Sequence, residues 1–299
     1  MINKKNEKAG LFMKKHILIV MAALLCTWLF CGCEEKELTG KNEQGSKEQY
    51  LIVTPFGGIE EDTAKLISLC LEEKGYASVI EHVDAVPSER DGVIGVIAVG
   101  CEARVAEGVP YVRASFDMGE EPKENVIAPC LTSGNVARAA LLLLPEASRF
   151  FVFSSEPGAA DVQAACDVLD ASGVDYTVET IGSGTLEEAV RKAEEKGSDA
   201  LILPSDRLCG GGFEITGDSF PVFAVGEGEP VQGALASFCI DAQRMARDTS
   251  DIAVALLEGR ETELRAESYY VLCISKCLAE KFTPDIEAVK EDFHVVIVE

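Results

Sequence analysis

The chain has 299 residues, with 27 Lys and Arg against 51 Asp and Glu, so its formal charge is −24 at pH 7. A surface this acidic repels phosphate backbones, which excludes nucleic acid as a partner. Only three histidines are present, and the acidic residues show no EF-hand spacing, so we expect no metal, no cofactor and no Ser-His-Asp triad.

The first 32 residues form a predicted signal peptide. Lys14 and Lys15 precede an apolar stretch over residues 17–29, and the small Gly32 follows. This order of basic, apolar and small residues is typical of a secretory leader. Because the signal is complete from Met13, residues 1–12 are interpreted as an overlong start.

The leader ends in Phe-Cys-Gly-Cys, which resembles a bacterial lipobox although Phe30 stands where leucine is usual. In that motif the cysteine, here Cys33, carries the lipid and becomes the first residue of the mature protein. Residues 33–49 are almost free of apolar side chains and are predicted to be a linker between the lipid anchor and a folded body. An uncleaved membrane anchor is the alternative. Either reading places the rest of the chain outside the cytoplasm.

From residue 50 onwards, short apolar runs alternate with amphipathic helical segments. The predicted strands are 50–54, 92–99, 110–115, 149–153, 175–181, 199–203, 221–225, 234–239 and 268–274. The predicted helices are 60–76, a short one after Glu102, 132–144, 160–172, one from the capping box Thr185–Glu188 to Gly197, and 241–259. Such alternation predicts an α/β fold with parallel sheets covered on both faces.

The strands are too numerous for one compact doubly wound sheet, so we expect two lobes. The break is predicted between Pro122 and Pro129, where the alternation restarts with a helix. In open parallel sheets a ligand sits beyond the carboxyl ends of the strands. Two such lobes that face each other would form a cleft.

Eight cysteines follow Cys33, and none forms a CxxC pair. Several lie within apolar patterns, where a free thiol behaves as a small hydrophobic side chain. We interpret most of them as buried thiols, which indicates a reducing habitat and not a disulfide scaffold. They are Cys70, Cys101, Cys130, Cys166, Cys209, Cys239, Cys273 and Cys277.

A family resemblance covers nearly the whole mature chain. It rests on the serial order of NVIAP, LLLLPEASRFFVFSSEPG, DALILPSD, FPVFAVGEGEPVQGALASFCID and ALLEGRE, and more weakly on LIVTPFGG, VIAVGCEA and ASFD. In this order the chain resembles the ABC-transporter substrate-binding lipoproteins of the tryptophan/tyrosine-binding type. That resemblance implies two doubly wound parallel-sheet lobes joined by a multi-strand hinge, the periplasmic-binding-protein-like I fold. It further implies a lobe I of 50–128 plus 238–262 and a lobe II of 129–237 plus 263–299.

The function implied by the resemblance is binding without catalysis. A small solute, an amino acid or a related compound, would bind in the inter-lobe cleft and pass to the permease subunits of an ABC importer in the membrane. The alternative is a ligand-sensing surface lipoprotein that signals to a membrane kinase.

The resemblance also implies that ligand contacts come from the loops after the strands of both lobes. Helix N-termini and hydroxyls in these loops are suited to a carboxylate, acidic side chains to an ammonium, and aromatic rings to an apolar body. The same glycines and hydroxyls also serve as turn and cap residues in many proteins. The implied residues are Phe56, Gly57, Gly58, Cys101, Glu102, Phe116, Asp117, Ser154, Ser155, Glu156, Ser205, Asp206, Arg207, Gly226 and Glu227.

One pair departs from the family pattern. Where the family often has Thr-Pro, this chain has Cys101-Glu102, and the extra negative charge argues against an amino-acid carboxylate in the same pose. A remote alternative is a racemase-like enzyme that places one thiol from each lobe, Cys101 and Cys209, across the cleft. No His or Lys adjoins either cysteine in the sequence to lower its pKa.

Overall fold

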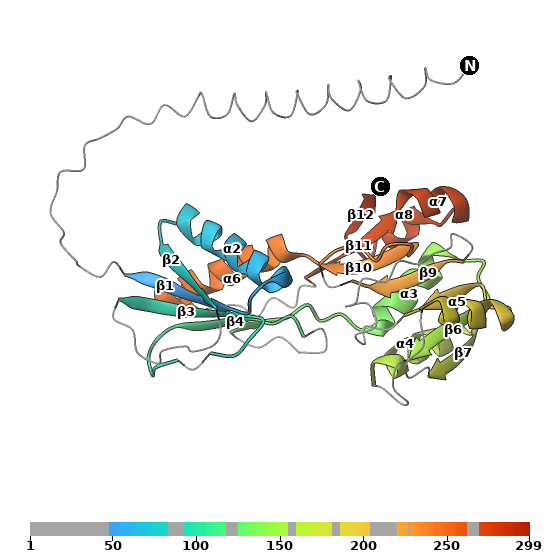
Figure 1. Ribbon diagram of the computed structural model, residues 1–299, viewed down its shortest axis with the longest axis horizontal. Coiled ribbons are helices and arrows are strands. Elements are labelled where there is room, and N and C mark those ends of the chain that lie inside the picture. Colours follow the sequence, from blue (N-terminus) through green and yellow to red (C-terminus); the bar gives the residue numbers. More distant parts are fainter. Residues whose placement is uncertain are drawn as a thin grey trace, which may run out of the picture. The chain divides into compact units, whose positions relative to one another are not determined.

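The computed structural model describes residues 48–82, 92–103, 105–117, 125–154, 160–180, 186–203, 220–226, 228–261 and 269–299. Residues 46–299 form one compact unit, drawn in Figure 1 with its helices and strands labelled. The predicted signal peptide, the lipidation site Cys33 and nearly all of the predicted linker lie outside the described residues. Within the described residues no helix is long and apolar enough to cross a membrane.

Sheet A is a parallel sheet with the strand order β2-β1-β3-β4-β5. Its strands are β1 (Gln49–Thr54), β2 (Ala77–His82), β3 (Val93–Val99), β4 (Tyr111–Ala114) and β5 (Val126–Ile127). Strand β1, between β2 and β3, is almost wholly buried, as expected for a parallel strand covered on both faces.

Two helices cover one face of sheet A, α2 (Gly58–Glu73) and α6 (Ala242–Leu257). Helix α2 follows β1 directly, whereas α6 comes from a distant part of the chain and lies beside it (Figure 1). Side chains of both helices pack with Tyr50 and Ile52 in one apolar cluster. The Tyr50 hydroxyl donates to the Ala253 carbonyl at 3.0 Å, which fastens β1 to α6.

The opposite face of sheet A is covered differently. Leu51, Val53 and Val96 pack there against side chains of the segment that follows β3, among them Cys101 and Val105. The described residues of this segment, 101–103 and 105–109, contain no helix. The predicted short helix after Glu102 is therefore wrong, because this segment buries its apolar residues against the sheet as an extended loop.

Sheet B has the strand order β12-β11-β10-β9-β8-β6-β7 and is parallel except where β10 and β11 meet. Its strands are β6 (Arg149–Ser154), β7 (Asp175–Thr180), β8 (Ala200–Ile202), β9 (Val222–Val225), β10 (Ala236–Ile240), β11 (Tyr270–Ser275) and β12 (Val295–Val298).

Helices cover both faces of sheet B. On one face lie α3 (Ser133–Leu143), α4 (Ala160–Ser172), α7 (Lys276–Phe282) and α8 (Ile286–Val289), which share a large cluster with the strands. On the other face α5 (Leu186–Glu195) packs Ala189 and Ala193 against Phe151 and Leu201. Alternate residues of β6 and β8 thus enter two different clusters, as the pleat of a strand requires.

The chain passes between the two sheets three times. It leaves sheet A after β5 to form α3, leaves sheet B after β10 to form α6, and returns to sheet B at β11. The prediction of an α/β fold with two mostly parallel sheets is confirmed. The lobe boundaries stay a prediction, although β10 keeps Phe238–Ile240 in sheet B, which moves the second crossing from residue 238 to after Ile240.

The predicted strands all exist, within a few residues of their expected ends. The sequence prediction missed β2, β5, β12, α7 and α8, and the strand at 268–274 is not the last one. Strand β5 also corrects the expectation that the chain restarts with a helix near Pro129, because it adds an edge strand to sheet A first. Strands β2, β5 and β12 lie at the edges of their sheets, and β5, α7 and α8 are short.

Candidate functional site

The turn between β1 and α2 contains the first three predicted ligand residues. Gly57 and Gly58 both have positive φ values, of 75° and 73°, which side chains with a Cβ rarely adopt. Two consecutive residues of this kind let the chain turn sharply from the end of β1 into the first turn of α2. Gly57 and Gly58 are therefore required by the turn whatever else they do.

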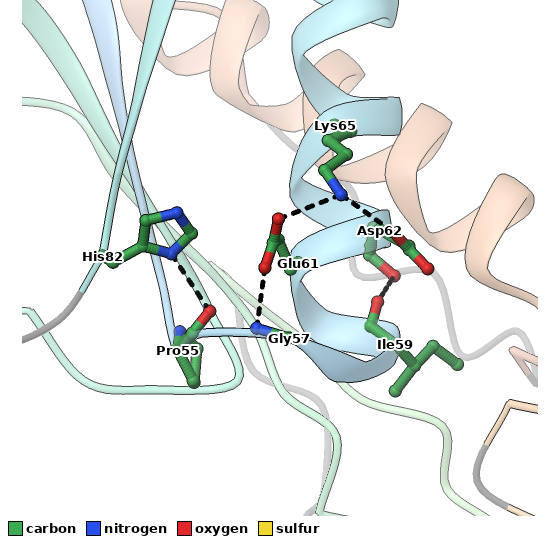
Figure 2. A network of polar contacts seen from close by, with 8 residues as sticks. Pro55, Gly57, Ile59, Glu61, Asp62, Lys65 and His82 are labelled. Atoms are coloured by element: carbon green, nitrogen blue, oxygen red, sulfur yellow. Dashed lines mark hydrogen bonds and ion pairs between the residues drawn. The ribbon is translucent and has the colours of Figure 1, made fainter.

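A carboxylate of α2 accepts a hydrogen bond from a backbone N–H of this turn (Figure 2). The Gly57 N–H donates to Glu61 Oε2 at 2.7 Å, and Glu61 Oε1 pairs with Lys65 Nζ at 3.0 Å. The hydrogen bond from Lys65 and that from Gly57 lower the pKa of Glu61. The Gly57 N–H, expected to be open to a ligand carboxylate, is already bound to an anionic side chain.

Phe56 lies outside this turn with most of its ring in solvent. Its side chain is 74% exposed and stacks on His82, with the ring centroids 4.0 Å apart and the planes 17° from parallel. His82 ends β2 and is held in place by a 3.3 Å hydrogen bond between its Nδ1 and the Pro55 carbonyl (Figure 2). One face of Phe56 is thus supported and the ring remains accessible, which is unusual for a large apolar side chain.

Thr54 ends β1 immediately before this turn. Thr54 is fully buried, and its hydroxyl has no hydrogen-bond partner among the described residues. Alternation along the strand puts it on the same face as Ile52, below α2. A buried hydroxyl of this kind calls for a partner, such as a water molecule or a ligand.

The loop after β3 lies against the first turn of α2. A Cβ at Gly100 would be 2.4 Å from Glu60 Cγ, so only glycine permits this approach. The next residue, Cys101, turns toward the sheet, and its thiol donates to the Val53 carbonyl at 3.5 Å. Burial raises the pKa of Cys101, which disfavours the thiolate that a racemase would need.

Glu102 points away from the sheet into solvent. Its side chain is 87% exposed, and its Oε1 is 3.2 Å from an Arg113 nitrogen whose side chain is mostly buried. The ion pair offsets part of the negative charge that Glu102 brings to this loop, although exposed pairs contribute little to stability.

The loop after β4 carries Phe116 and Asp117. Phe116 packs against the apolar cluster below α2 and α6 and is partly buried. The Asp117 backbone N–H donates to the Ser115 hydroxyl at 3.2 Å. The loops after β1, β3 and β4 therefore lie at the carboxyl edge of sheet A, as predicted from the parallel order of the strands.

In sheet B, Ser154 is the last residue of β6 and Gly226 directly follows β9. The Gly226 N–H donates to the Phe238 carbonyl at 2.8 Å, and a Cβ at Gly226 would be 2.2 Å from the Glu229 carbonyl oxygen. Both observations show that the loop after β9 folds tightly at the carboxyl edge of sheet B.

A contact joins the carboxyl edges of the two sheets. A Cβ at Gly228, in the loop after β9, would be 3.0 Å from Ile59 Cδ1, in the first turn of α2. The segment that follows β1 and the loop after β9 therefore meet. The missing side chain of Gly228 is what makes room for Ile59.

The remaining predicted ligand residues lie outside the described residues, as does Cys209 of the racemase alternative. They are Ser155, Glu156, Ser205, Asp206, Arg207 and Glu227. Within the described part of the chain, no group of three or more His, Cys, Asp or Glu side chains is arranged to hold a metal ion.

Three residues at this edge escaped the sequence analysis: Ile59, Glu61 and His82. Glu61 was placed only within the predicted helix and Ile59 just before it, and neither was given a role in the turn. His82 lies on β2, which was not predicted. A histidine at the end of an apolar run, on the strand next to β1, was the signal that would have pointed to it.

No protein-family model and no curated protein sequence matches the chain. Solved structures do match it over most of its length. One is a domain described as an ABC domain in complex with L-tryptophan, from Streptococcus pneumonia, with 17% identity, a TM-score of 0.52, and coverage of 83% of this chain and 100% of that one.

Two further structures match similarly. A ligand-free, open substrate-binding protein with adhesive properties from Clostridium difficile has 14% identity and a TM-score of 0.60, over 85% of this chain and all of the other. A conserved domain protein from Vibrio cholerae has 15% identity and a TM-score of 0.52, over 84% of this chain and all of the other. The chain thus has a periplasmic-binding-protein-like I fold, distantly similar in structure to ABC substrate-binding proteins.

Proposed function

We propose that the chain is an extracytoplasmic solute-binding lipoprotein of an ABC importer. It binds a small solute, an amino acid or a related compound, between the carboxyl edges of its two sheets and delivers it to permease subunits in the membrane. Cys33 carries the lipid that holds it at the bacterial cell membrane. The observation that carries this proposal is the contact between Gly228 and Ile59, because loops of both sheets must meet if one ligand is to bridge them.

The chemistry of the loop after β1 supports a ligand site. Phe56 presents an exposed ring, stacked on His82, that can cover an apolar body. An accessible aromatic ring in the loop after β1 suits the mostly apolar lining of small-molecule sites.

The charges at the edge of sheet A favour one orientation of a zwitterionic solute. Glu60 and Glu61 lie in the first turn of α2 and Glu102 lies in the loop after β3, and Glu61 already accepts the hydrogen bond of the Gly57 N–H. A ligand carboxylate there would meet like charge. We therefore expect a ligand ammonium to face sheet A and any carboxylate to face the loops of sheet B.

Isothermal titration calorimetry of the purified chain against single amino acids, amines and nucleosides tests the binding step. We expect saturable heat with at least one compound, and weaker binding by about fivefold after Phe56→Ala, since a stacked ring contributes about 1 kcal/mol. Leu69→Ala is the matched control, because Leu69 is a similarly exposed apolar side chain on α2 away from the turn. Absence of heat with every compound would count against the proposal.

The contact between the loops is tested by a rescue. Gly228→Ala should weaken binding, because the new Cβ meets Ile59 when the loops approach. In the double variant Gly228→Ala, Ile59→Ala, much of the lost affinity should return, because the Ile59 side chain that the new Cβ contacts has been removed. If Gly228→Ala binds like the unchanged chain, the loops do not close on the solute.

Lipid attachment has a separate test. Cells that express the chain and grow with labelled palmitate should label it, and Cys33→Ser should abolish the label. Release of the Cys33→Ser chain into the extracytoplasmic fraction would support the proposed location. Retention of the label in that variant would contradict it.

A further inference from the structure

Two cysteines of sheet B lie side by side on neighbouring strands. In the antiparallel pair of β10 and β11, Cys239 is opposite Val271 and Cys273 is opposite Ser237. Opposite residues share a face, and so do residues two apart along a strand. Cys239 and Cys273 are thus diagonal neighbours on one face. Both are free thiols and both are buried, with exposures of 3% and 6%.

The two thiols interact directly. A hydrogen bond between them raises the pKa of Cys239, with burial adding to the effect, and the same bond lowers the pKa of Cys273. The two thiols therefore act on each other, unlike two hydrophobic side chains that only pack together.

The pair occupies a special place in the chain. Strand β10 leads into the crossing to α6, and β11 begins where the chain returns. Just beyond the pair, the Asp241 N–H donates to the Tyr269 carbonyl at 2.9 Å, which holds the outgoing and returning segments together. A covalent bond between the two sulfurs would fasten the same two segments on the sheet B side of the crossing.

We propose that Cys239 and Cys273 form an oxidation site, a dithiol that a small disulfide converts into a cross-strand disulfide. One of the two thiols loses its proton, attacks one sulfur of the small disulfide, forms a mixed disulfide and releases one small thiolate. The other thiol then loses its proton and attacks the protein sulfur of the mixed disulfide, which displaces the second small thiolate. In sum, two protein thiols are oxidised to one disulfide, and one small disulfide takes up the two electrons and two protons as two small thiols.

Diagonal neighbours usually lie farther apart than the Cβ atoms of a relaxed disulfide. Closing the bond must therefore draw β10 and β11 together locally. A bond formed in this way is reduced more readily than a relaxed structural disulfide. We expect the pair to cycle between its two states and not to stay locked in the oxidised one.

The test uses the whole chain, reduced and then freed of reductant, and incubated with bis(2-hydroxyethyl) disulfide. Free thiols are blocked by alkylation, and trypsin with a glutamate-specific protease separates Cys239 from Cys209 and Cys273 from Cys277. Mass spectrometry should find a peptide that links Cys239 to Cys273 in at least half of the molecules. Brief treatment with dithiothreitol should remove the link.

Single variants test whether each thiol is needed. In Cys239→Ser and in Cys273→Ser no cross-linked peptide should form, and the remaining cysteine of the pair should be recovered as the mixed disulfide or alkylated. Cys166→Ser is the matched control, because Cys166 is also buried but interacts with the Tyr176 hydroxyl, and the link should form there as in the unchanged chain.

The exposed Cys277 reports whether the oxidant works. If Cys277 acquires the mixed disulfide while Cys239 and Cys273 are both recovered alkylated in the unchanged chain, the proposal is wrong. A link from either cysteine to a different partner would overturn it as well. The result with the unchanged chain is sufficient to reject the proposal. The test therefore does not depend on whether every variant folds.

Discussion

Sheet A and sheet B are both built from parallel strands, yet they are covered in different ways. Sheet B has helices on both faces, supplied mostly by segments next to its own strands. Sheet A has α2 and the distant helix α6 on one face, while on the other face the described residues provide a loop. The same alternation of strands and helices in the sequence is therefore compatible with two packings. A sheet face can be buried by a helix or by a loop, provided that the segment carries apolar side chains.

The largest expected effect is in the core of sheet B. Phe238 is buried on β10 and packs edge-on against Tyr270 and Phe293, with centroids 5.2 Å away in both cases. Phe238→Ala should lower the free energy of unfolding by about 3–5 kcal/mol, since it leaves a large cavity under α7 and α8. Chemical denaturation measures the change in unfolding free energy. A decrease below about 1 kcal/mol would show that neighbouring side chains move in to fill the cavity.

A matched pair of substitutions sharpens the comparison between a helix cover and a loop cover. Leu201 lies under α5 in sheet B, and Leu51 lies under the loop after β3 in sheet A. Leu201→Ala should cost about 4 kcal/mol and Leu51→Ala about 2–3 kcal/mol, because a loop can relax into the cavity more easily than a helix. Equal losses in denaturation experiments would mean that the loop is as rigid as the helix.

The link between sheet A and its distant helix is tested at Tyr50. Burial raises the pKa of Tyr50, and its hydroxyl donates to the Ala253 carbonyl of α6. Tyr50→Phe should cost about 1–2 kcal/mol of unfolding free energy, since it also leaves that carbonyl unsatisfied. Tyr176→Phe is the control, because the Tyr176 hydroxyl bonds to Asp170 at the surface, and its loss should stay below about 0.5 kcal/mol. A larger loss at Tyr176 would contradict the assignment.

The smallest effect depends on pH. Burial tends to raise the pKa of Asp199, but hydrogen bonds from the Ser148 and Arg149 backbone and the Ser148 hydroxyl outweigh it, and the pKa is lowered. A lowered folded-state pKa stabilises the fold above the unfolded pKa of about 4, and the gain is lost as pH falls through the lower folded value. Asp199→Asn should therefore cost less than about 1 kcal/mol at pH 7, after solvent screening.

Unfolding of Asp199→Asn and the unchanged chain at pH 7 and at pH 3 checks this prediction. The difference in unfolding free energy should shrink toward zero at the lower pH, as the carboxylate takes up a proton. A difference that grows on acidification would reverse the sign and exclude the assigned cause.

Much of the fold was predictable because long buried strands carry an unmistakable apolar pattern. β1, β3 and β6 were found near their true ends, and so were α3, α4 and α6. Strand β2 was missed because its apolar residues are only half-buried at a sheet edge. The segment after β3 looked helical but packs as a loop, since the sheet and not the segment's own periodicity determines its conformation.

The candidate site was predictable only as a set of loops. The parallel order of the strands correctly put the loops after β1, β3 and β4 at one edge. It did not reveal that Glu61 occupies the Gly57 N–H, that His82 supports Phe56, or that Cys101 turns toward Val53. The contacts of His82 and Cys101 join residues of different elements, which sequence spacing does not specify, and the bond from Gly57 to Glu61 depends on how the chain turns into α2.

By itself, the sequence determined the class of the fold, the acidity of the surface, the short turns that need glycine and the edges where ligand loops must lie. These are local properties, set by apolar periodicity, charge and backbone freedom. Only the tertiary structure decided that α6 covers sheet A, that Gly228 meets Ile59 and that Cys239 and Cys273 are diagonal neighbours. Such contacts depend on strand register and on the path of the chain between sheets, because residues far apart in sequence become neighbours only when the whole chain has folded.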